Sequence, residues 1–218
     1  MTDSFSRESF RAARLLLGLF IFSLGVVMTL QPKLGFPPWD VFHQGVGLHL
    51  GLTIGRVSIL VSVIIVAIVV FLKEKVGFGT LANVILVGFF VDVIMSRSWV
   101  PPANSFVFSF ATMLCGFFVM GLGCFLYIGA GPRDSLMVVL TKRTGKPVGL
   151  CRSSIEATVL FTGWLLGGPV GWGTLISALG IGASIQIVFS IMRFDVKAIH
   201  QETCRETLTR LRKMASRS

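Results

Sequence analysis

Long apolar runs alternate with short polar segments along most of the chain. Six of these runs are each long enough, at roughly 17–25 residues, to cross the hydrocarbon core of a bilayer as a helix. They cover residues 14–31, 54–72, 77–96, 105–128, 148–167 and 172–192. The pattern predicts an all-α, polytopic integral membrane protein with six transmembrane helices.

The composition supports this fold class. Of 218 residues, 53% are hydrophobic and only 14% are charged, whereas about 25% of the residues in soluble domains are charged. An ordinary soluble enzyme and a disordered chain are therefore excluded. Four cysteines (Cys115, Cys124, Cys151 and Cys204) show no paired spacing, so neither a disulfide framework nor a metal site is predicted.

The basic residues indicate how the chain is oriented. The net charge is +10, but the Lys and Arg residues lie between and outside the apolar runs, which argues against nucleic-acid binding. With a cytoplasmic N-terminus, seventeen of the twenty fall in cytoplasmic segments, and only Lys33, Arg56 and Arg97 fall outside. Cytoplasmic loops carry such an excess of positive charge, so both termini are expected in the cytoplasm.

The two halves of the sequence resemble each other at an offset of 94 residues. The shared positions are Gly35, Pro38, Asp40, Gly51, Gly55, Gly77, Gly79, Thr80, Leu81 and Gly88, which recur as Gly129, Pro132, Asp134, Gly145, Gly149, Gly171, Gly173, Thr174, Leu175 and Gly182. Earlier in each half, Gly18 and Gly25 match Gly116 and Gly123 at an offset of 98. Each half contains three spans, and because three is odd, the second copy is predicted to be inverted in the membrane.

This repeat gives the expected organisation of the chain. It comprises a cytoplasmic segment (1–13), a first membrane repeat (14–96), a periplasmic loop (97–104), a second membrane repeat (105–192) and a basic cytoplasmic tail (193–218). The tail carries apolar residues at helical spacing among basic ones, which favours a helix lying on an anionic lipid surface. A solvated tail is the alternative. Inverted repeats are typical of secondary transporters, whose substrate site lies at the repeat interface.

Each half also contains a segment too short to span, at 36–50 and 130–145. Both have a Gly-containing break followed by Pro-x-Asp, which is typical of a helix start because Pro fits the first turn and Asp complements the exposed amides. Each segment is predicted to be a short helix, either re-entrant or lying in the membrane interface. We favour the re-entrant alternative, in which the two helices enter the membrane from opposite faces.

Asp40 and Asp134 recur in these two short helices. One interpretation is that both cap their helices. The other is that they form a pair of carboxylates lining a central cavity, where they bind a cation, a proton or a polar substrate. The sequence leaves both interpretations open.

Five further residues are candidates for a substrate or ion site. Asp92 and Glu156 lie inside predicted spans, where a charge is costly unless it faces protein or water. Asp92 also lies near a helix end from which it can reach the interface, and Glu156 can pair with Arg152 four residues earlier. Arg56 and Arg152 can anchor helix ends or bind an anionic group, and His43 lies one turn after Asp40.

The first half contains three short motifs: Pro38-Trp39-Asp40, His43-Gln44-Gly45 and Gly77-Phe78-Gly79-Thr80-Leu81-Ala82-Asn83, the last continuing to Gly88 and Asp92. These motifs resemble those of the YczE/YyaS/YitT family of bacterial integral membrane proteins. The resemblance extends from the first span through the sixth. It implies a protein of the bacterial inner (plasma) membrane and implies no particular substrate. The second half departs from the motif of the first, because Arg133 stands where the first has Trp39.

Together these patterns favour a transporter or channel for a small solute or ion, with a polar site between the repeats. The alternative is an accessory protein that scaffolds a membrane partner, and an intramembrane enzyme using Asp40 and Asp134 is a third, weaker alternative. No enzymatic activity, cofactor or nucleic-acid partner is expected. The expected partners are the lipid bilayer and a small-molecule or ion substrate, and a homo-oligomer is compatible with the sequence.

Overall fold

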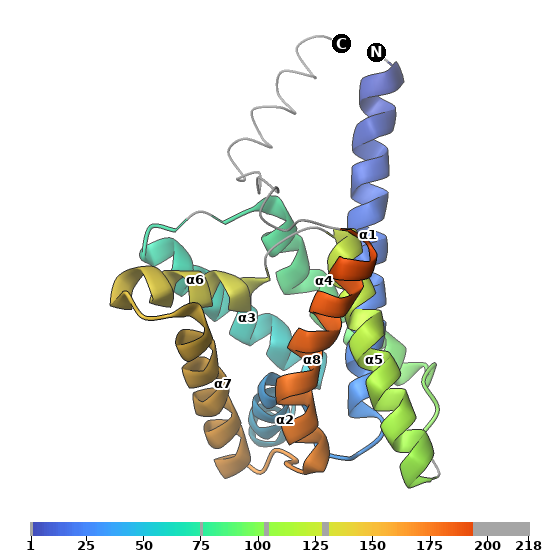
Figure 1. Ribbon diagram of the computed structural model, residues 1–218, viewed down its shortest axis with the longest axis vertical. Coiled ribbons are helices and arrows are strands. Elements are labelled where there is room, and N and C mark those ends of the chain that lie inside the picture. The colour runs from blue at the N-terminus through green and yellow to red at the C-terminus, as the bar shows by residue number, and fades with distance from the viewer. Residues whose placement is uncertain (1, 75, 103–104, 128–130, 194–218) are drawn as a thin grey trace.

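The computed structural model describes residues 2–74, 76–102, 105–127 and 131–193, with only the helical backbone described for residues 2–8. These residues form eight helices, which Figure 1 shows packed as one bundle. The helices are α1 (Thr2–Leu30), α2 (Pro38–Leu50), α3 (Ile54–Phe71), α4 (Phe78–Ser96), α5 (Phe106–Tyr127), α6 (Pro132–Thr144), α7 (Val148–Leu165) and α8 (Trp172–Ile191). The fold class predicted from the sequence is therefore correct at the level of a helical membrane protein.

Five helical segments among the described residues are long and apolar enough to cross a membrane. They are Ser9–Leu30, Ile54–Phe71, Phe78–Ser96, Phe106–Tyr127 and Trp172–Ile191, and they correspond to five of the six predicted spans. The sixth forms helix α7, but it is not among the five, because Arg152, Glu156 and several hydroxyl side chains make it less apolar. Helix α1 also begins earlier than residue 14. The tail predicted at 193–218 lies outside the described residues except for Arg193.

The two short segments form helices α2 and α6, each of 13 residues. Each begins with a proline in its first turn and ends at a glycine in the left-handed conformation, Gly51 at φ 64° and Gly145 at φ 67°. Glycine adopts this conformation without steric cost, so both helices end at equivalent positions. At 13 residues, neither helix is long enough to span the bilayer.

Helices α1 and α5 run antiparallel and touch closely at glycines. A side chain at Gly25 would meet Met120, and one at Gly123 would meet Phe22. Phe22 and Met120 are themselves related by the offset of 98 that relates Gly25 to Gly123. The Gly25–Met120 and Gly123–Phe22 contacts are therefore equivalent to each other when the two halves are exchanged, and small residues allow the backbones to approach.

The other helix contacts also occur in matching pairs. Helix α1 packs against α4 as α5 packs against α8, and α2 packs against α7 as α6 packs against α3. One contact breaks the correspondence, because α3 packs along α4, whereas α7 and α8 have no comparable contact among the described residues. Helix α7 is thus separated from α8, whereas the equivalent helices α3 and α4 are packed together.

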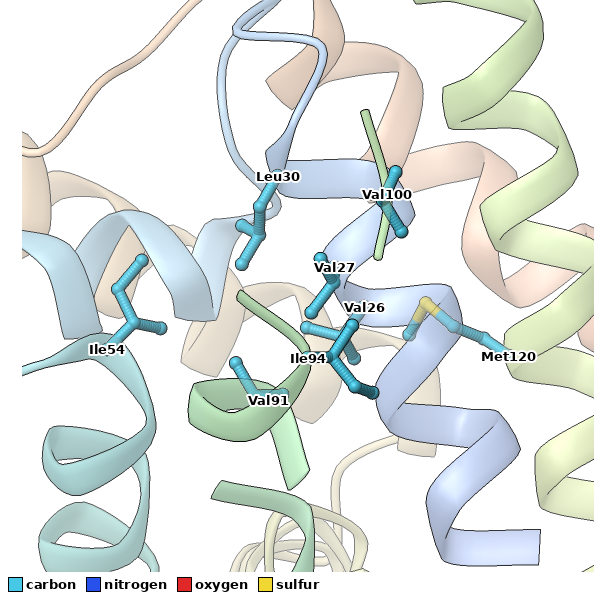
Figure 2. Packing of buried hydrophobic residues seen from close by; sticks show 8 residues of the cluster. All are labelled: Val26, Val27, Leu30, Ile54, Val91, Ile94, Val100 and Met120. Carbon is cyan, nitrogen blue, oxygen red and sulfur yellow. The ribbon is translucent and has the colours of Figure 1, made fainter. Parts of the chain in front are cut away.

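The largest apolar core lies where α1, α3, α4 and α5 meet. Figure 2 shows its eight buried side chains: Val26, Val27, Leu30, Ile54, Val91, Ile94, Val100 and Met120. A smaller cluster joins α2, α3 and α6 through Trp39, Ile65, Val69 and Val139. The second cluster packs α2 and α6 against α3, beside the space between the halves.

Candidate functional site

A cavity of about 190 Å³ lies between the two halves of the bundle. Side chains from all eight helices line it. At roughly 30 Å³ per molecule in the liquid, this volume holds about six waters, and it is smaller than the pockets that bind drug-sized ligands. The cavity is therefore suited to a small solute or to ions.

Most of the lining consists of equivalent positions from the two halves. Of the 27 lining residues, 22 form pairs at the offsets of 94 or 98. The pairs are Phe22 with Met120, Val26 with Cys124, Pro37 with Gly131, Pro38 with Pro132, Trp39 with Arg133, Asp40 with Asp134, Ser58 with Arg152, Ser62 with Glu156, Asn83 with Ser177, Val87 with Ile181 and Val91 with Ile185. The same places in both halves thus build opposite walls of the cavity.

Trp39 and Arg133 occupy equivalent positions and also touch each other. The Arg133 guanidinium carbon lies 4.8 Å from the centre of the Trp39 ring. This cation–π contact compensates in part for removing the guanidinium from water. It joins the N-terminal ends of α2 and α6 across the cavity.

Asp40 and Asp134 occupy the same helix position but have different partners. The Asp134 carboxylate accepts a hydrogen bond of 3.2 Å from the Gly131 backbone N–H, which completes a helix cap. The equivalent of Gly131 is Pro37, which has no N–H to donate. Asp40 therefore has no such cap, and its side chain is nearly buried, with 6% of the residue exposed.

The second half supplies an additional ion pair. Arg152 Nε donates to Glu156 Oε1 over 2.9 Å, where the first half has Ser58 and Ser62. The Ser177 hydroxyl on α8 is buried, with no hydrogen-bond partner in the described part of the chain. The cavity therefore offers charges of both signs together with an unpartnered hydroxyl group.

The structure places the other predicted site residues away from the cavity lining. Asp92 accepts hydrogen bonds from Thr53 Oγ1 at 2.5 Å and from the Gly55 N–H at 2.9 Å, so it joins α4 to the start of α3. Arg56 is exposed on α3. His43 is fully buried, with its Nδ1 atom 3.4 Å from Asp40 Oδ1. Of the seven candidates, Asp40, Asp134, Arg152 and Glu156 line the cavity.

The two halves differ in how open they are. The Cβ atom of an alanine at Gly55 would collide with the Gly88 carbonyl, whereas one at the equivalent Gly149 would meet no atom within 4 Å. Asp134 is exposed, in contrast to Asp40, and the Arg152 side chain is 48% exposed. The cavity is thus closed where α3 meets α4 and more open beside α6 and α7.

Sequence reasoning did not select several polar lining residues, among them Arg133, Tyr127, Asn83 and Ser177. The repeat could have indicated Arg133 as a site residue, because Arg133 occupies the position equivalent to Trp39, next to the repeated aspartate. Asn83 and Ser177 are equivalent to each other as well, but single polar residues within helices carry little information alone. Among the described residues, no group of three or more His, Cys, Asp or Glu side chains is arranged to hold a metal ion.

Comparisons with known proteins agree with the helical membrane fold. Residues 9–190 match the model of a family of unknown function, DUF6198. The chain is 37% identical over 171 residues to the uncharacterized membrane protein YczE of Bacillus subtilis, covering 76% of this chain and 79% of that protein. It is 36% identical to an uncharacterized protein of Haemophilus influenzae, covering 82% of this chain and 83% of the relative.

A more distant relative is the uncharacterized protein YyaS of Bacillus subtilis, at 25% identity over 81% of this chain and 90% of that protein. No solved structure matches this chain. The family match covers most of the residues that form the helices and the cavity. The chain therefore belongs to the DUF6198 family and, with its relatives YczE and YyaS, to a family of bacterial multi-pass membrane proteins.

Proposed function

We propose that this protein is a transporter of a small polar solute in the bacterial inner membrane and that the cavity between its halves is the substrate site. The two halves are proposed to be inverted repeats, with α1 to α4 equivalent to α5 to α8. The observation that carries the proposal is the lining of the cavity, in which 22 of 27 residues form equivalent pairs. Inverted-repeat transporters bind substrate at such an interface, near the bilayer midplane.

The charges in the cavity also favour transport over a purely structural role. Asp40, Arg133, Asp134, Arg152 and Glu156 come from α2, α6 and α7 and line a cavity that the five candidate spans also line. Ionisable groups are costly at membrane depth and usually mark a pathway for a substrate or ion. A scaffold protein could bury the same interface with apolar side chains at lower cost.

The difference between the halves supports alternating access. The lysines and arginines favour an orientation with the N-terminus of α3 on the periplasmic side and that of α7 on the cytoplasmic side. In this orientation, the Gly55–Gly88 contact closes the cavity towards the periplasm, and the separation of α7 from α8 opens it towards the cytoplasm. The outward-facing state would exchange these arrangements, bringing Gly149 towards Gly182 and separating α3 from α4.

Ligand binding to the cavity is testable by thermal unfolding of the purified protein. The probes are individual amino acids, small organic acids, polyamines and inorganic ions. At least one is expected to raise the melting temperature, because a ligand that binds only the folded state stabilises it, by about 2.7 kcal/mol at a concentration of 100 Kd.

Two variants identify where such a probe binds. Asp134→Asn changes a cavity carboxylate and should weaken the stabilisation, whereas Glu74→Gln changes a carboxylate that pairs with Lys142 outside the cavity lining and should leave it unchanged. Equal stabilisation of both variants would place the binding site elsewhere. If no probe produces a shift and the protein instead co-purifies stably with one membrane protein, the scaffold alternative would replace the proposal.

A further inference from the structure

We infer that Asp40 and His43 together form a proton-binding site that couples proton movement to the transport cycle. The inference rests on the proposed function, because it assigns the coupling ion of the same cavity. It follows from the way the chain leaves one buried carboxylate and one buried imidazole without hydrogen bonds, side by side at the cavity wall. The equivalent place in the second half lacks the imidazole, since Met137 stands there.

The Asp40 carboxylate is free because of the residue that precedes its helix. In α6, Asp134 accepts from the N–H of Gly131, the residue at the N-cap. In α2, the N-cap residue is Pro37, whose nitrogen carries no hydrogen. Within the described chain, no hydrogen bond to the Asp40 carboxylate is present, although it faces the cavity. A buried carboxylate is costly unless another group pairs with it.

His43 is the group with which Asp40 can share that proton. Its ring is fully buried near the rings of Trp39 and Phe42, and neither ring nitrogen has a hydrogen-bond partner among the described residues. The Nδ1 atom lies 3.4 Å from Asp40 Oδ1, which is slightly long for a hydrogen bond. With a proton on Nδ1, His43 would donate to the Asp40 carboxylate, whereas its Nε2 would still have no partner among the described residues.

The other ionisable side chain of α2 is His49, which bonds the Gly45 carbonyl. Besides Asp40, the charged group acting on His43 is Arg133 of α6, which is held over Trp39. Among the helices packed against α2, α8 carries no ionisable residue and α3 carries only the exposed Arg56. On α7, Arg152 and Glu156 pair with each other, and Cys151 is a buried thiol.

The proton balance connects the pair to the cavity. With a neutral imidazole and an ionised carboxylate, the pair carries one negative charge. Binding one proton from water in the cavity, through Asp40, makes the pair neutral. Before proton binding, the cavity lining carries three carboxylates (Asp40, Asp134 and Glu156) and two guanidinium groups (Arg133 and Arg152). Binding of the proton removes the excess negative charge, so that the net charge of the lining becomes zero. A cavity without net charge is easier to close and carry between the two faces of the membrane.

The fluorescence of Trp39 reports the protonation of His43 without any transported solute. The two ring centres lie 6.3 Å apart, and an imidazolium at this distance quenches indole emission. A protein that retains Trp39, with Trp99, Trp164 and Trp172 changed to Phe, should show emission that changes as the pH is lowered, with a midpoint below the ordinary histidine value because burial lowers the pKa of His43. Adding His43→Gln should abolish the titration, whereas His49→Gln should preserve it, because His49 is on the same helix but bonds the Gly45 carbonyl.

Asp40→Asn is a second test of the proton site, which can be used if His43→Gln does not fold. It preserves the shape of the side chain and should lower the midpoint of the titration, because Asp40, as a hydrogen-bond acceptor and a negative charge, raises the pKa of His43. A flat profile in the parent protein, or an unchanged titration in His43→Gln or Asp40→Asn, would overturn the inference. These outcomes are independent of the ligand screen, so a failure of the proton site is distinguishable from a failure of the proposed transport function.

Discussion

Gly55→Ala should destabilise the protein by about 1–3 kcal/mol, whereas the equivalent substitution Gly149→Ala should be neutral or slightly stabilising. The added methyl group at Gly55 collides with the Gly88 carbonyl and the Asp92 carboxylate, both of which are fixed by packing. Overpacking of this kind costs about 1–3 kcal/mol. At Gly149 the methyl group meets no atom within 4 Å, and alanine is the better helix former.

The measurement is the apparent melting temperature of each variant in the same detergent. The two substitutions are matched in chemistry and in repeat position, so a difference between them reports the asymmetry of the two halves. Equal destabilisation of both variants would mean that α7 is packed against α8 as tightly as α3 is packed against α4. The open side of the cavity would then be wrongly assigned.

Asp92→Ala should cost about 2–4 kcal/mol and loosen the closed side of the cavity. The substitution removes the acceptor of two hydrogen bonds, from Thr53 Oγ1 and from the Gly55 N–H. A hydrogen bond to a charged group contributes about 1.5–3 kcal/mol. The part-buried bond from Gly55 supplies most of the loss, because the bond from Thr53 is exposed and contributes less. Hydrogen exchange at the Gly55 amide should accelerate, and the melting temperature should fall.

Glu74→Gln is the matched control for the loss of a carboxylate. Its ion pair with Lys142 spans 2.8 Å, but the Lys142 side chain is 59% exposed, and exposed pairs contribute only about 0–1 kcal/mol. If Asp92→Ala changed stability and exchange no more than Glu74→Gln did, Asp92 would not hold α3 against α4. The closure of the cavity between α3 and α4 would then need another explanation.

The sequence predicted the fold well because its dominant signals are local. Runs of apolar residues set the positions of five candidate spans, and the Pro-x-Asp segments form the short helices α2 and α6. Helix α7 was harder to classify, since Arg152 and Glu156 face a cavity and lower its hydropathy. The offset between the two halves could be recognised in the sequence because both halves keep the same glycines and prolines. These residues lie at close helix contacts and at helix ends.

The site was predicted less completely, because its chemistry depends on neighbours distant in sequence. Asp40 and Asp134 were selected together, but their different partners follow from Pro37 and Gly131. The prediction for Asp92 considered only its own helix, whereas its partners are on α3. The charge of Arg56 made it a candidate for the site, but its position in the first turn of α3 places it at the surface.

The most direct test of the account is whether water reaches the space between the two halves. Single cysteines are introduced by Ser58→Cys or Leu60→Cys into a protein whose own cysteines are replaced by alanine, and membranes are treated with a hydrophilic thiol reagent. Ser58 lines the cavity, whereas Leu60 is exposed on the apolar outer face of the same helix, two residues away. Because the thiolate reacts and forms only where water is present, Ser58→Cys should be labelled about tenfold faster or more. Equal rates, or faster labelling of Leu60→Cys, would contradict the existence of a hydrated central site.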